Sequence, residues 1–386
     1  MTDNSLDSYI GVFWGCKQEE LSVNTCMLNR FEERQKRRFG LTKEQELKST
    51  IIRPKNYKYG IRSFNKTTME FYRDLFEVLD VINPIIQINA ISKVEYFLRR
   101  TFEKVDMPFT YYFNENAFYY TLTKFMITYH NKELINGLYN IIDMASLDNF
   151  IQLLLFDLRC ILDAIYGIER KEQEILAFEQ LYEVLSEAKL TFNLTKKFDF
   201  AYFVNFEGLQ RLLEEKDIDI CKVKLVLDQE EKTFLNAKEY PFLLVKQDDS
   251  KENIHLRFSD LLSGFVGQIM RAMANDENVM EDNIGDIRKI KENDLERKRL
   301  LSKEWFDLSS EQFDLYMKLY EVLITPHQEY WTCMTLNYCD QVIMFFTLIR
   351  YISSYREYEK FKQTRLELHP EYYDSACIRE LERHYI

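Results

Sequence analysis

Two aspartates lie at the edges of segments that are expected to form the core, one at the end of a strand and one on a helix. Carboxylates in such positions can bind a metal ion. Asp228 ends the segment 222–228 (KVKLVLD), which has the composition of a short buried strand. Asp260 lies within the segment 254–273, which contains FSDLLSGFVG and has the apolar content of a core helix. A buried carboxylate is costly unless it is paired or binds a cation. An acid after a strand is also an ordinary turn residue, so both interpretations stay open at this point.

The segment around Asp260 also carries two glycines on one helical face. Gly264 and Gly267 follow Asp260 at spacings of four and seven residues. A glycine in the interior of a helix costs about 1 kcal/mol relative to alanine. Two of them on one face therefore indicate close packing against a sheet, which would bring Asp260 to the edge of that sheet. The alternative is that both glycines only relieve crowding in an aromatic core.

His255 is the histidine nearest to these acids, five residues before Asp260. It is of the residue type that transfers protons or orients a ligand near neutral pH. We expect it instead to lie at the start of the helix and to face solvent.

The hydrophobic patterns predict a mixed α/β core with helical additions. Four segments have the short apolar composition of strands: 9–15, 84–91, 222–228 and 241–246. Helical patterns cover most of the rest: 19–39, 68–81, 93–104, 118–129, 132–142, 147–166, 172–188, 205–216, 254–273, 307–323, 328–355 and 377–384. The 10 glycines and 6 prolines are few for 386 residues, which favours long helices over an all-β fold.

Four short motifs occur in a fixed order along the chain. They are Asp3-Asn4-Ser5, Glu46-Leu47-Lys48-Ser49, Leu225-Val226-Leu227-Asp228 and Phe258-Ser259-Asp260-Leu261-Leu262-Ser263-Gly264. Over residues 1–273 this order resembles the bacterial domain-of-unknown-function family numbered 3800. The resemblance implies a ribonuclease-H-like fold, and it places four carboxylates at a catalytic metal site: Asp3, Glu46, Asp228 and Asp260.

The chemistry that the resemblance implies is hydrolysis assisted by two metal ions. Two Mg²⁺ or Mn²⁺ ions about 4 Å apart activate a water and stabilise the leaving oxygen of a phosphodiester. Such a pair needs three or four carboxylates from separate elements, because octahedral Mg²⁺ keeps several of its waters. Asp228 would be the central ligand on a strand and Glu46 a ligand on a helix or loop. Asp260 would close the site from its helix.

The resemblance and the patterns together divide the chain into a discontinuous core and two helical additions. Residues 1–110 and 191–274 would form the core, a ribonuclease-H-like mixed sheet with its helices. A large helical insertion would occupy 111–190, and an all-helical C-terminal region would occupy 275–386. Residues 275–303 are rich in charges and poor in aromatic side chains, so we expect a solvated linker or an exposed helix there.

One strongly basic segment lies beside Glu46 in a protein whose net charge is −12. Residues 34–66 contain eleven Lys or Arg and only two acids. Tyr57, Tyr59 and Phe64 lie between these cations and are of the types that stack on unpaired bases. The alternative is a solvated loop that balances an acidic protein. Five of the cations are candidate contacts to a nucleic-acid backbone: Lys48, Arg53, Lys55, Lys58 and Arg62.

Composition argues against several classes of protein. The negative net charge argues against a protein that coats nucleic acid without specificity, but it is compatible with a nuclease that has a local basic channel. Seven cysteines without a CxxC pair indicate neither a disulfide framework nor a zinc site. The motifs G-x-x-x-x-G-K-S/T, G-x-S-x-G and H-E-x-x-H do not occur. The polar N-terminus and the lack of a long uncharged apolar run predict a cytoplasmic protein without a membrane span.

The leading interpretation is a metal-dependent, ribonuclease-H-like nuclease that cleaves RNA or DNA phosphodiesters. Members of the family that the chain resembles are often found among mobile and phage-defence genes, which implies an antiviral setting. The competing interpretation is a binding protein that keeps the fold without the catalytic site and uses its aromatic helical regions to bind a protein partner or a second copy. The Asp3-Asn4-Ser5 motif, with only two residues ahead of it, favours this competitor. An all-helical scaffold would require the four strand predictions to be wrong.

Overall fold

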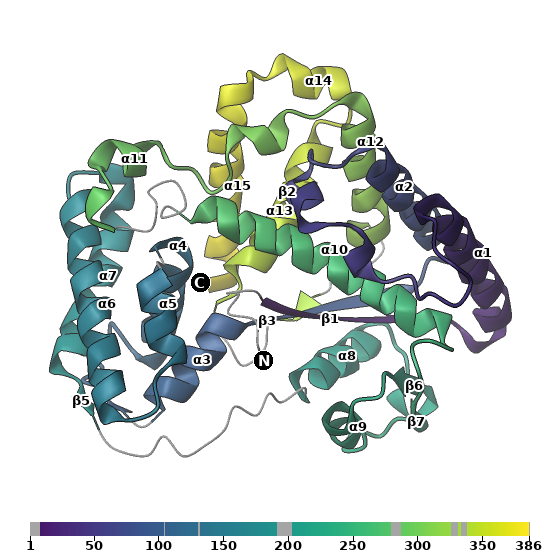
Figure 1. The fold of residues 1–386 in the computed structure, drawn as a ribbon, viewed down its shortest axis with the longest axis horizontal. Coiled ribbons are helices and arrows are strands. Elements are labelled where there is room, and N and C mark those ends of the chain that lie inside the picture. The colour runs from purple at the N-terminus through teal and green to yellow at the C-terminus, as the bar shows by residue number, and fades with distance from the viewer. Residues whose placement is uncertain are drawn as a thin grey trace.

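The computed structural model describes residues 8–103, 105–129, 132–190, 203–278, 287–325, 331–332 and 338–385. Within these residues the chain is mostly helical with small β-sheets, which agrees with the mixed α/β prediction at that level. Figure 1 shows a small central sheet with helices packed around it and a group of helices to one side. None of the helices in the described ranges combines the length and the apolar character that crossing a bilayer requires.

The central sheet is built on one long antiparallel pair of strands. β1 (Ser8–Gly15) pairs with β3 (Ile85–Ser92) along its whole length, with Ser8 opposite Ser92 and Gly15 opposite Ile85. β8 (Trp331–Thr332) joins the other edge of β3 in parallel. The isoleucine, valine and aromatic residues of β1 and β3 favour an extended backbone that packs on a half-buried surface. The strands predicted at 9–15 and 84–91 are therefore confirmed.

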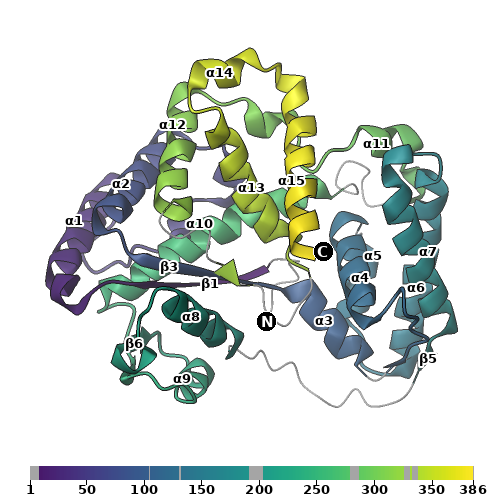
Figure 2. The same ribbon diagram turned by 180° about the vertical axis from the view of Figure 1, so that it is seen from behind.

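Helices cover both faces of this sheet. α10 (Ile254–Glu277) lies across β1, with helices from both ends of the chain around it (Figure 1). α8 (Phe203–Glu215) covers the opposite face beside β3 (Figure 2). The helix predicted at 254–273 is thus confirmed and runs one turn longer. The helices around α10 are α1 (Leu21–Phe39), α2 (Lys66–Ile82), α12 (Ser310–Leu319) and α13 (Asp340–Ser354).

The C-terminal region shares the main hydrophobic core instead of forming one of its own. Most buried side chains between Leu301 and Cys377 belong to the same cluster as those of α1, α2, β3 and α10, whereas Tyr338 belongs to the cluster of the helical bundle described below. Trp305 is fully buried in this cluster and packs on Gly60, whose positive φ of 56° and missing side chain leave room for the indole ring. The other elements of this region are the 3₁₀ helix η8 (Lys303–Phe306), α14 (Tyr358–Gln363) and α15 (His369–Tyr385). The strand β2 (Lys58–Ile61), which carries Gly60, packs against η8.

The predicted insertion is a bundle of helices with a hydrophobic cluster of its own. The four helices expected between residues 118 and 188 are confirmed, and α3 packs with them. Ile287, Ile290 and Leu295 are also buried in this cluster, so the described part of the segment 275–303, which leaves out 279–286, is not the solvated linker that its charges predict. The elements are α3 (Lys93–Phe102), β4 (Val105–Asp106), α4 (Glu115–Tyr129), α5 (Lys132–Tyr139), α6 (Met144–Ile165), α7 (Glu172–Glu187), β5 (Lys189–Leu190) and α11 (Glu292–Arg297).

Buried polar contacts join this bundle to the core. Asp340 at the start of α13 accepts hydrogen bonds from Tyr120 Oη at 3.0 Å and from Lys124 Nζ at 2.9 Å, both on α4. Glu277 at the end of α10 accepts a bond from Thr128 Oγ1 at 3.1 Å, and burial raises the pKa of its carboxyl group. Polar groups removed from water are costly unless they are paired, so these contacts hold α4 in one position against α10 and α13.

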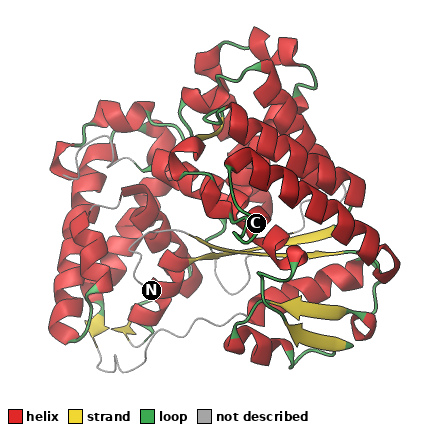
Figure 3. Ribbon diagram, turned by 45° about the vertical axis from the view of Figure 1, so that its right-hand side comes forward, coloured by secondary structure: helices red, strands yellow, loops and turns green. Residues whose placement is uncertain are grey.

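The strands predicted at 222–228 and 241–246 are present but form a separate sheet. β6 (Lys224–Leu227) and β7 (Leu244–Gln247) pair with each other in parallel. They pack with α8 and with α9 (Glu231–Ala237) around a small cluster that is centred on Phe206. Figure 3 shows this unit beside the β1–β3 pair, with no strand shared between them. In the described residues the sheet around β1 is therefore smaller than the predicted mixed sheet.

The start of α10 is fixed by a buried ion pair with α1. Arg257 donates from Nε to Glu32 Oε1 and from Nη2 to Glu32 Oε2, both at 2.8 Å. Its Nη1 donates to the carbonyl oxygens of Ser250 and Lys251 at 2.6 and 2.8 Å. Both charged side chains are 9% exposed, so the two-pronged contact is shielded from water. The pair sets how α10 is placed against α1 and against the loop that follows β7.

We predict that replacing Glu32→Gln destabilises the protein by about 3 kcal/mol, because the Arg257 charge then lies buried without a counter-charge. Urea unfolding followed by tryptophan fluorescence measures the loss. Glu33→Gln is the matched control, since Glu33 is the next residue of α1 and is exposed. Equal unfolding midpoints for the two variants would show that the Glu32–Arg257 pair does not hold the helices together.

Candidate functional site

The predicted metal ligands lie on different parts of the structure. Asp3 falls outside the described residues. Glu46 lies in the loop between α1 and the 3₁₀ helix η2 (Ser49–Ile51), Asp228 follows β6, and Asp260 is on the second turn of α10. Asp228 and Asp260 are exposed, and the Glu46 side chain is 15% exposed. The interpretation of Asp228 and Asp260 as buried carboxylates that need a cation is therefore wrong, and their exposure agrees with the alternative of ordinary surface residues.

Two of the four sequence motifs meet in the structure. The backbone N–H of Ser49 donates to Asp260 Oδ2 at 3.1 Å. Ser49 ends the motif that contains Glu46, whose carboxylate forms an ion pair with Lys48 Nζ at 3.2 Å. The hydrogen bond therefore attaches the loop that carries Glu46 to the exposed side of α10.

Gly264 permits this close approach. A Cβ atom at Gly264 would lie 2.2 Å from Ser49 Cβ and 2.6 Å from Ser49 Oγ, closer than non-bonded atoms can come. A Cβ atom at Gly267 would lie 3.6 Å from Ile10 Cγ1 on β1, which is an ordinary contact. Close packing is thus present at Gly264 but against η2 and not against a sheet, whereas Gly267 faces β1 without being tightly packed, so the prediction that both glycines pack closely on a sheet is wrong.

Asp228 has a local role in its own turn. Its Oδ1 accepts a hydrogen bond from the backbone N–H of Gln229 at 2.9 Å, at the end of β6. No three His, Cys, Asp or Glu side chains within the described ranges are grouped so that they could hold a metal ion. Glu46, Asp228 and Asp260 thus do not form the predicted centre by themselves, and their oxygens already contact Lys48, Gln229 and Ser49. The Mg²⁺ or Mn²⁺ site stays a prediction, because Asp3 is not described.

The predicted backbone contacts fall into two groups. Three are engaged elsewhere: Lys48 with Glu46, Arg62 with Asp307 at 3.0 Å, and Lys58 over the ring of Tyr59 at 4.9 Å. Arg53 and Lys55 are exposed and form no ion pair with any described acid. These two cations are therefore available for an anionic ligand.

The predicted aromatic platform beside these cations is wrong for two of its three residues. Tyr57 and Phe64 are 1% and 6% exposed, and both pack against Tyr72 inside the main core. The hydroxyl groups of Tyr57 and Tyr72 also form a hydrogen bond, and burial raises the pKa of Tyr57 to about 12. Tyr57 and Phe64 stabilise the loop from within and cannot stack on bases.

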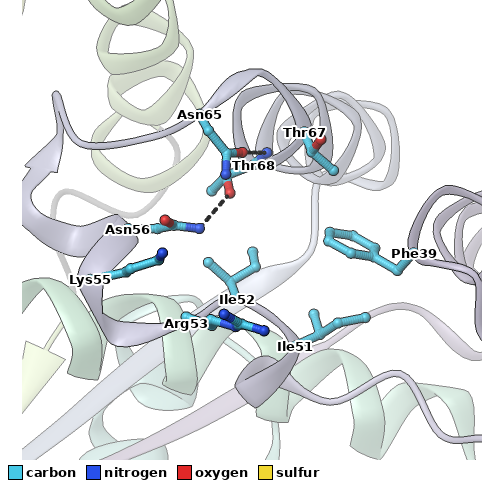
Figure 4. A pocket seen from close by; sticks show the side chains of 9 residues that line it. All are labelled: Phe39, Ile51, Ile52, Arg53, Lys55, Asn56, Asn65, Thr67 and Thr68. Atoms are coloured by element: carbon cyan, nitrogen blue, oxygen red, sulfur yellow. Dashed lines mark hydrogen bonds between the residues drawn. The ribbon is translucent and has the colours of Figure 1, made fainter.

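A pocket of about 290 Å³ opens beside Arg53 and Lys55. It lies between the end of α1, the segment from η2 through the 3₁₀ helix η3 (Pro54–Tyr57), and the start of α2. Figure 4 shows Lys55, Asn56 and Asn65 on one side of the pocket and Phe39 with Ile51 on the other. Ile52 and Thr68 form the buried inner wall. Thr67 and Arg53 complete the lining.

The first turn of α2 supplies the polar wall of this pocket. Asn65 is the N-cap, and its side chain accepts a hydrogen bond from the Thr68 N–H at 2.9 Å. Asn56 Nδ2 donates to Thr68 Oγ1 at 3.3 Å, which joins η3 to the same turn (Figure 4). The N–H groups that begin a helix have no partner within it and carry partial positive charge, so they favour an anion.

Sequence reasoning found Arg53 and Lys55 but missed Asn65, Thr67 and Thr68. The helical pattern predicts a start at residue 68, whereas α2 begins at Lys66. An asparagine just before the first apolar residues of a helix is a known start signal. Applied to Asn65, it would have placed the helix N-terminus beside the basic segment.

His255 lies at the start of α10 as predicted, but its side chain is partly buried and does not simply face solvent. Its ring stacks on Trp14 with centroids 5.1 Å apart, and its Nε2 lies 2.8 Å from Thr25 Oγ1. Burial lowers the pKa of the imidazole. His255 thus fixes the start of α10 against β1 and α1.

We predict opposite outcomes for alanine at the two glycines of α10. Gly267→Ala has room and adds a better helix former, so the free energy of unfolding stays unchanged or rises by up to about 1 kcal/mol. Gly264→Ala forces η2 away from α10, so the free energy of unfolding falls by about 1–3 kcal/mol. Denaturant unfolding of both variants measures this. An increase for Gly264→Ala equal to that of Gly267→Ala would contradict the close approach.

The chain was compared with family models, curated proteins and solved structures, and none of them matches it. The resemblance to the family numbered 3800, and the ribonuclease-H-like fold that it implies, therefore stay predictions that rest on the four motifs.

Proposed function

We propose that this protein binds nucleic acid, with phosphate groups held at the pocket between η2, η3 and the start of α2. One observation carries the proposal. Arg53 and Lys55 are exposed beside the pocket and form no ion pair with any described acid. They line the same pocket as Asn65 and Thr67 at the N-terminus of α2 (Figure 4). The pocket thus combines a guanidinium group, an ammonium group and the partial positive charge at the N-terminus of α2, where the Thr68 N–H itself is already bonded to Asn65.

The charge distribution supports the same proposal. The whole chain carries a net charge of −12, so it repels a polyanion in general. Arg34 and Arg38 share the carboxylate of Asp74 on α2 at 3.2 and 2.8 Å, and Arg38 also pairs with Glu70 at 3.5 Å. Binding would therefore depend mainly on the cations around the pocket that have no such ion pair, and it would be sensitive to salt.

Cleavage of the bound strand is the second candidate function. It is favoured by the contact that attaches the Glu46 loop to Asp260, since a ribonuclease-H-like nuclease needs these two motifs side by side. Mg²⁺ or Mn²⁺ would be the cofactor of that reaction, and the described carboxylates do not assemble its site without a further ligand. The family resemblance adds phage defence as the proposed setting. Without catalysis, the protein would be a binding protein whose helical regions contact a protein partner.

We predict that Arg53→Gln with Lys55→Gln weakens binding of single-stranded RNA or DNA about tenfold or more at moderate salt. The slope of log affinity against log salt should fall by about 1.4, because about 0.7 is lost for each phosphate contact on a single strand. Fluorescence anisotropy at several salt concentrations measures both quantities.

The control for this experiment is Lys222→Gln with Lys224→Gln, which removes two exposed charges from the β6 unit. This variant should bind as the wild type does. Equal losses in the two double variants would mean that general charge, and not the pocket, determines binding. Absence of binding by the wild type would refute the proposal.

We predict, for the second candidate, that labelled RNA or DNA is cleaved in Mg²⁺ or Mn²⁺ and that Asp260→Asn abolishes the cleavage. Asparagine keeps an oxygen that can accept the Ser49 N–H, so the loop stays attached while the carboxylate charge is lost. Asp228→Ala, tested in parallel, asks whether the residue after β6 takes part. Equal turnover by wild type and Asp260→Asn, or none by either, counts against the nuclease.

A further inference from the structure

The pocket beside α2 has the dimensions and chemistry for one nucleotide. Ligand pockets commonly have volumes of roughly 300–1,000 Å³. At about 290 Å³ this pocket lies at the lower end of that range. Its inner wall is closed by Ile52 and Thr68, both 2% exposed, so a strand cannot pass through it. A chain end, or a free mononucleotide, fits such a pocket better than the interior of a strand does.

We infer that this pocket binds a nucleotide that carries a free phosphate monoester, either at the end of a strand or as a nucleoside monophosphate. The strand-end case rests on the proposed function and names its substrate class. The free nucleotide shares the same chemistry and is distinguished by experiment.

The charge of the pocket matches a monoester better than a diester. A phosphate monoester carries between about −1.5 and −2 charges at pH 7, whereas a diester carries one. Arg53 and Lys55 supply two positive charges, and the N-terminus of α2 adds about half of one. Arg53, Lys55 and the N-terminus of α2 can therefore balance the second negative charge of a monoester, and no cation has to leave an existing ion pair.

The opposite side of the pocket suits a base or a ribose. Phe39 and Ile51 are only partly buried and lie across the pocket from Lys55 and Asn65 (Figure 4). A base can pack on the apolar surfaces of Phe39 and Ile51, with Ile52 behind them. These side chains form no hydrogen bonds to the edge of the base, so they do not distinguish one base from another. Asn56 Oδ1 and the Thr67 hydroxyl are the remaining polar groups that a sugar could contact. Recognition would depend on the phosphate and tolerate any base.

Asn65 allows a sharp test, because it can be changed without losing the helix cap. Asparagine, aspartate and serine are comparable N-caps, so Asn65→Asp and Asn65→Ser both keep the bond to the Thr68 N–H. Only Asn65→Asp adds a negative charge at the phosphate side of the pocket. Thermal unfolding should show that both variants remain as stable as the wild type, so an effect on binding is not an effect on folding.

We predict that an oligonucleotide with a phosphate at one end binds wild-type protein at least about tenfold more tightly than the same oligonucleotide with hydroxyl ends. Arms with a 5′-phosphate, a 3′-phosphate and no phosphate, each labelled at the opposite end or internally, identify the end. Adenosine monophosphate is the competitor for the free-nucleotide case. Asn65→Asp should abolish the preference for phosphate, and Asn65→Ser, which adds no charge, should reduce it far less.

Each outcome of this experiment decides a different point. Tight binding of oligonucleotides without a phosphate preference overturns the inference and leaves the proposed function standing. A phosphate preference that Asn65→Asp does not reduce also overturns it, because the phosphate then binds elsewhere. Adenosine monophosphate binding that Asn65→Asp abolishes, with no oligonucleotide binding, supports the pocket and refutes the proposed function. Absence of binding by every ligand refutes both.

Discussion

The close approach between the helix α10 and the loop at Ser49 is the constraint on which the polar surface of this protein depends. It exists because position 264 has no side chain. The backbone of Ser49 is attached to α10 through Asp260. From Ser49 the chain forms η2 and then η3, and both of these short helices pack against α10. Arg53 and Lys55 are thereby presented at the start of α2. A glycine on a core helix thus permits the loop contact that helps to place these two cations.

The contact between α1 and α10, and the inner side of the basic loop, are rigid for a different reason. Arg257 and Glu32 hold α10 against α1 in one orientation, and Tyr57 and Phe64 hold the basic loop from inside the core. Buried ion pairs add little net stability compared with apolar packing, but they penalise any other arrangement of the same helices. The exposed cations therefore stand on a fixed frame, which lowers the ordering cost of binding an anion.

The sequence predicts the elements of this protein better than their assembly. The patterns around Tyr9, Ile88 and Asp260 place two strands and a helix correctly, because burial imposes a period that is visible locally. The patterns do not reveal that β6 pairs with β7 and with no other strand in the described residues, or that Ile287 and Leu295 are buried, since both depend on distant partners. For the candidate site, the sequence shows the basic residues Arg53 and Lys55 directly. The sequence indicates the N-terminus of α2 beside them only through its capping residue, Asn65.

The pairing of Ile88 with Trp331 has a consequence for how the chain acquires its structure. Parallel strands so far apart in sequence can meet only after a long loop has closed, which slows folding. During synthesis the β1–β3 pair is complete long before β8 and the C-terminal helices leave the ribosome. The open edge of β3 and the face of α10 then expose apolar surface that invites aggregation. We expect nascent chains that stop before residue 331 to depend on chaperones more than the finished protein does.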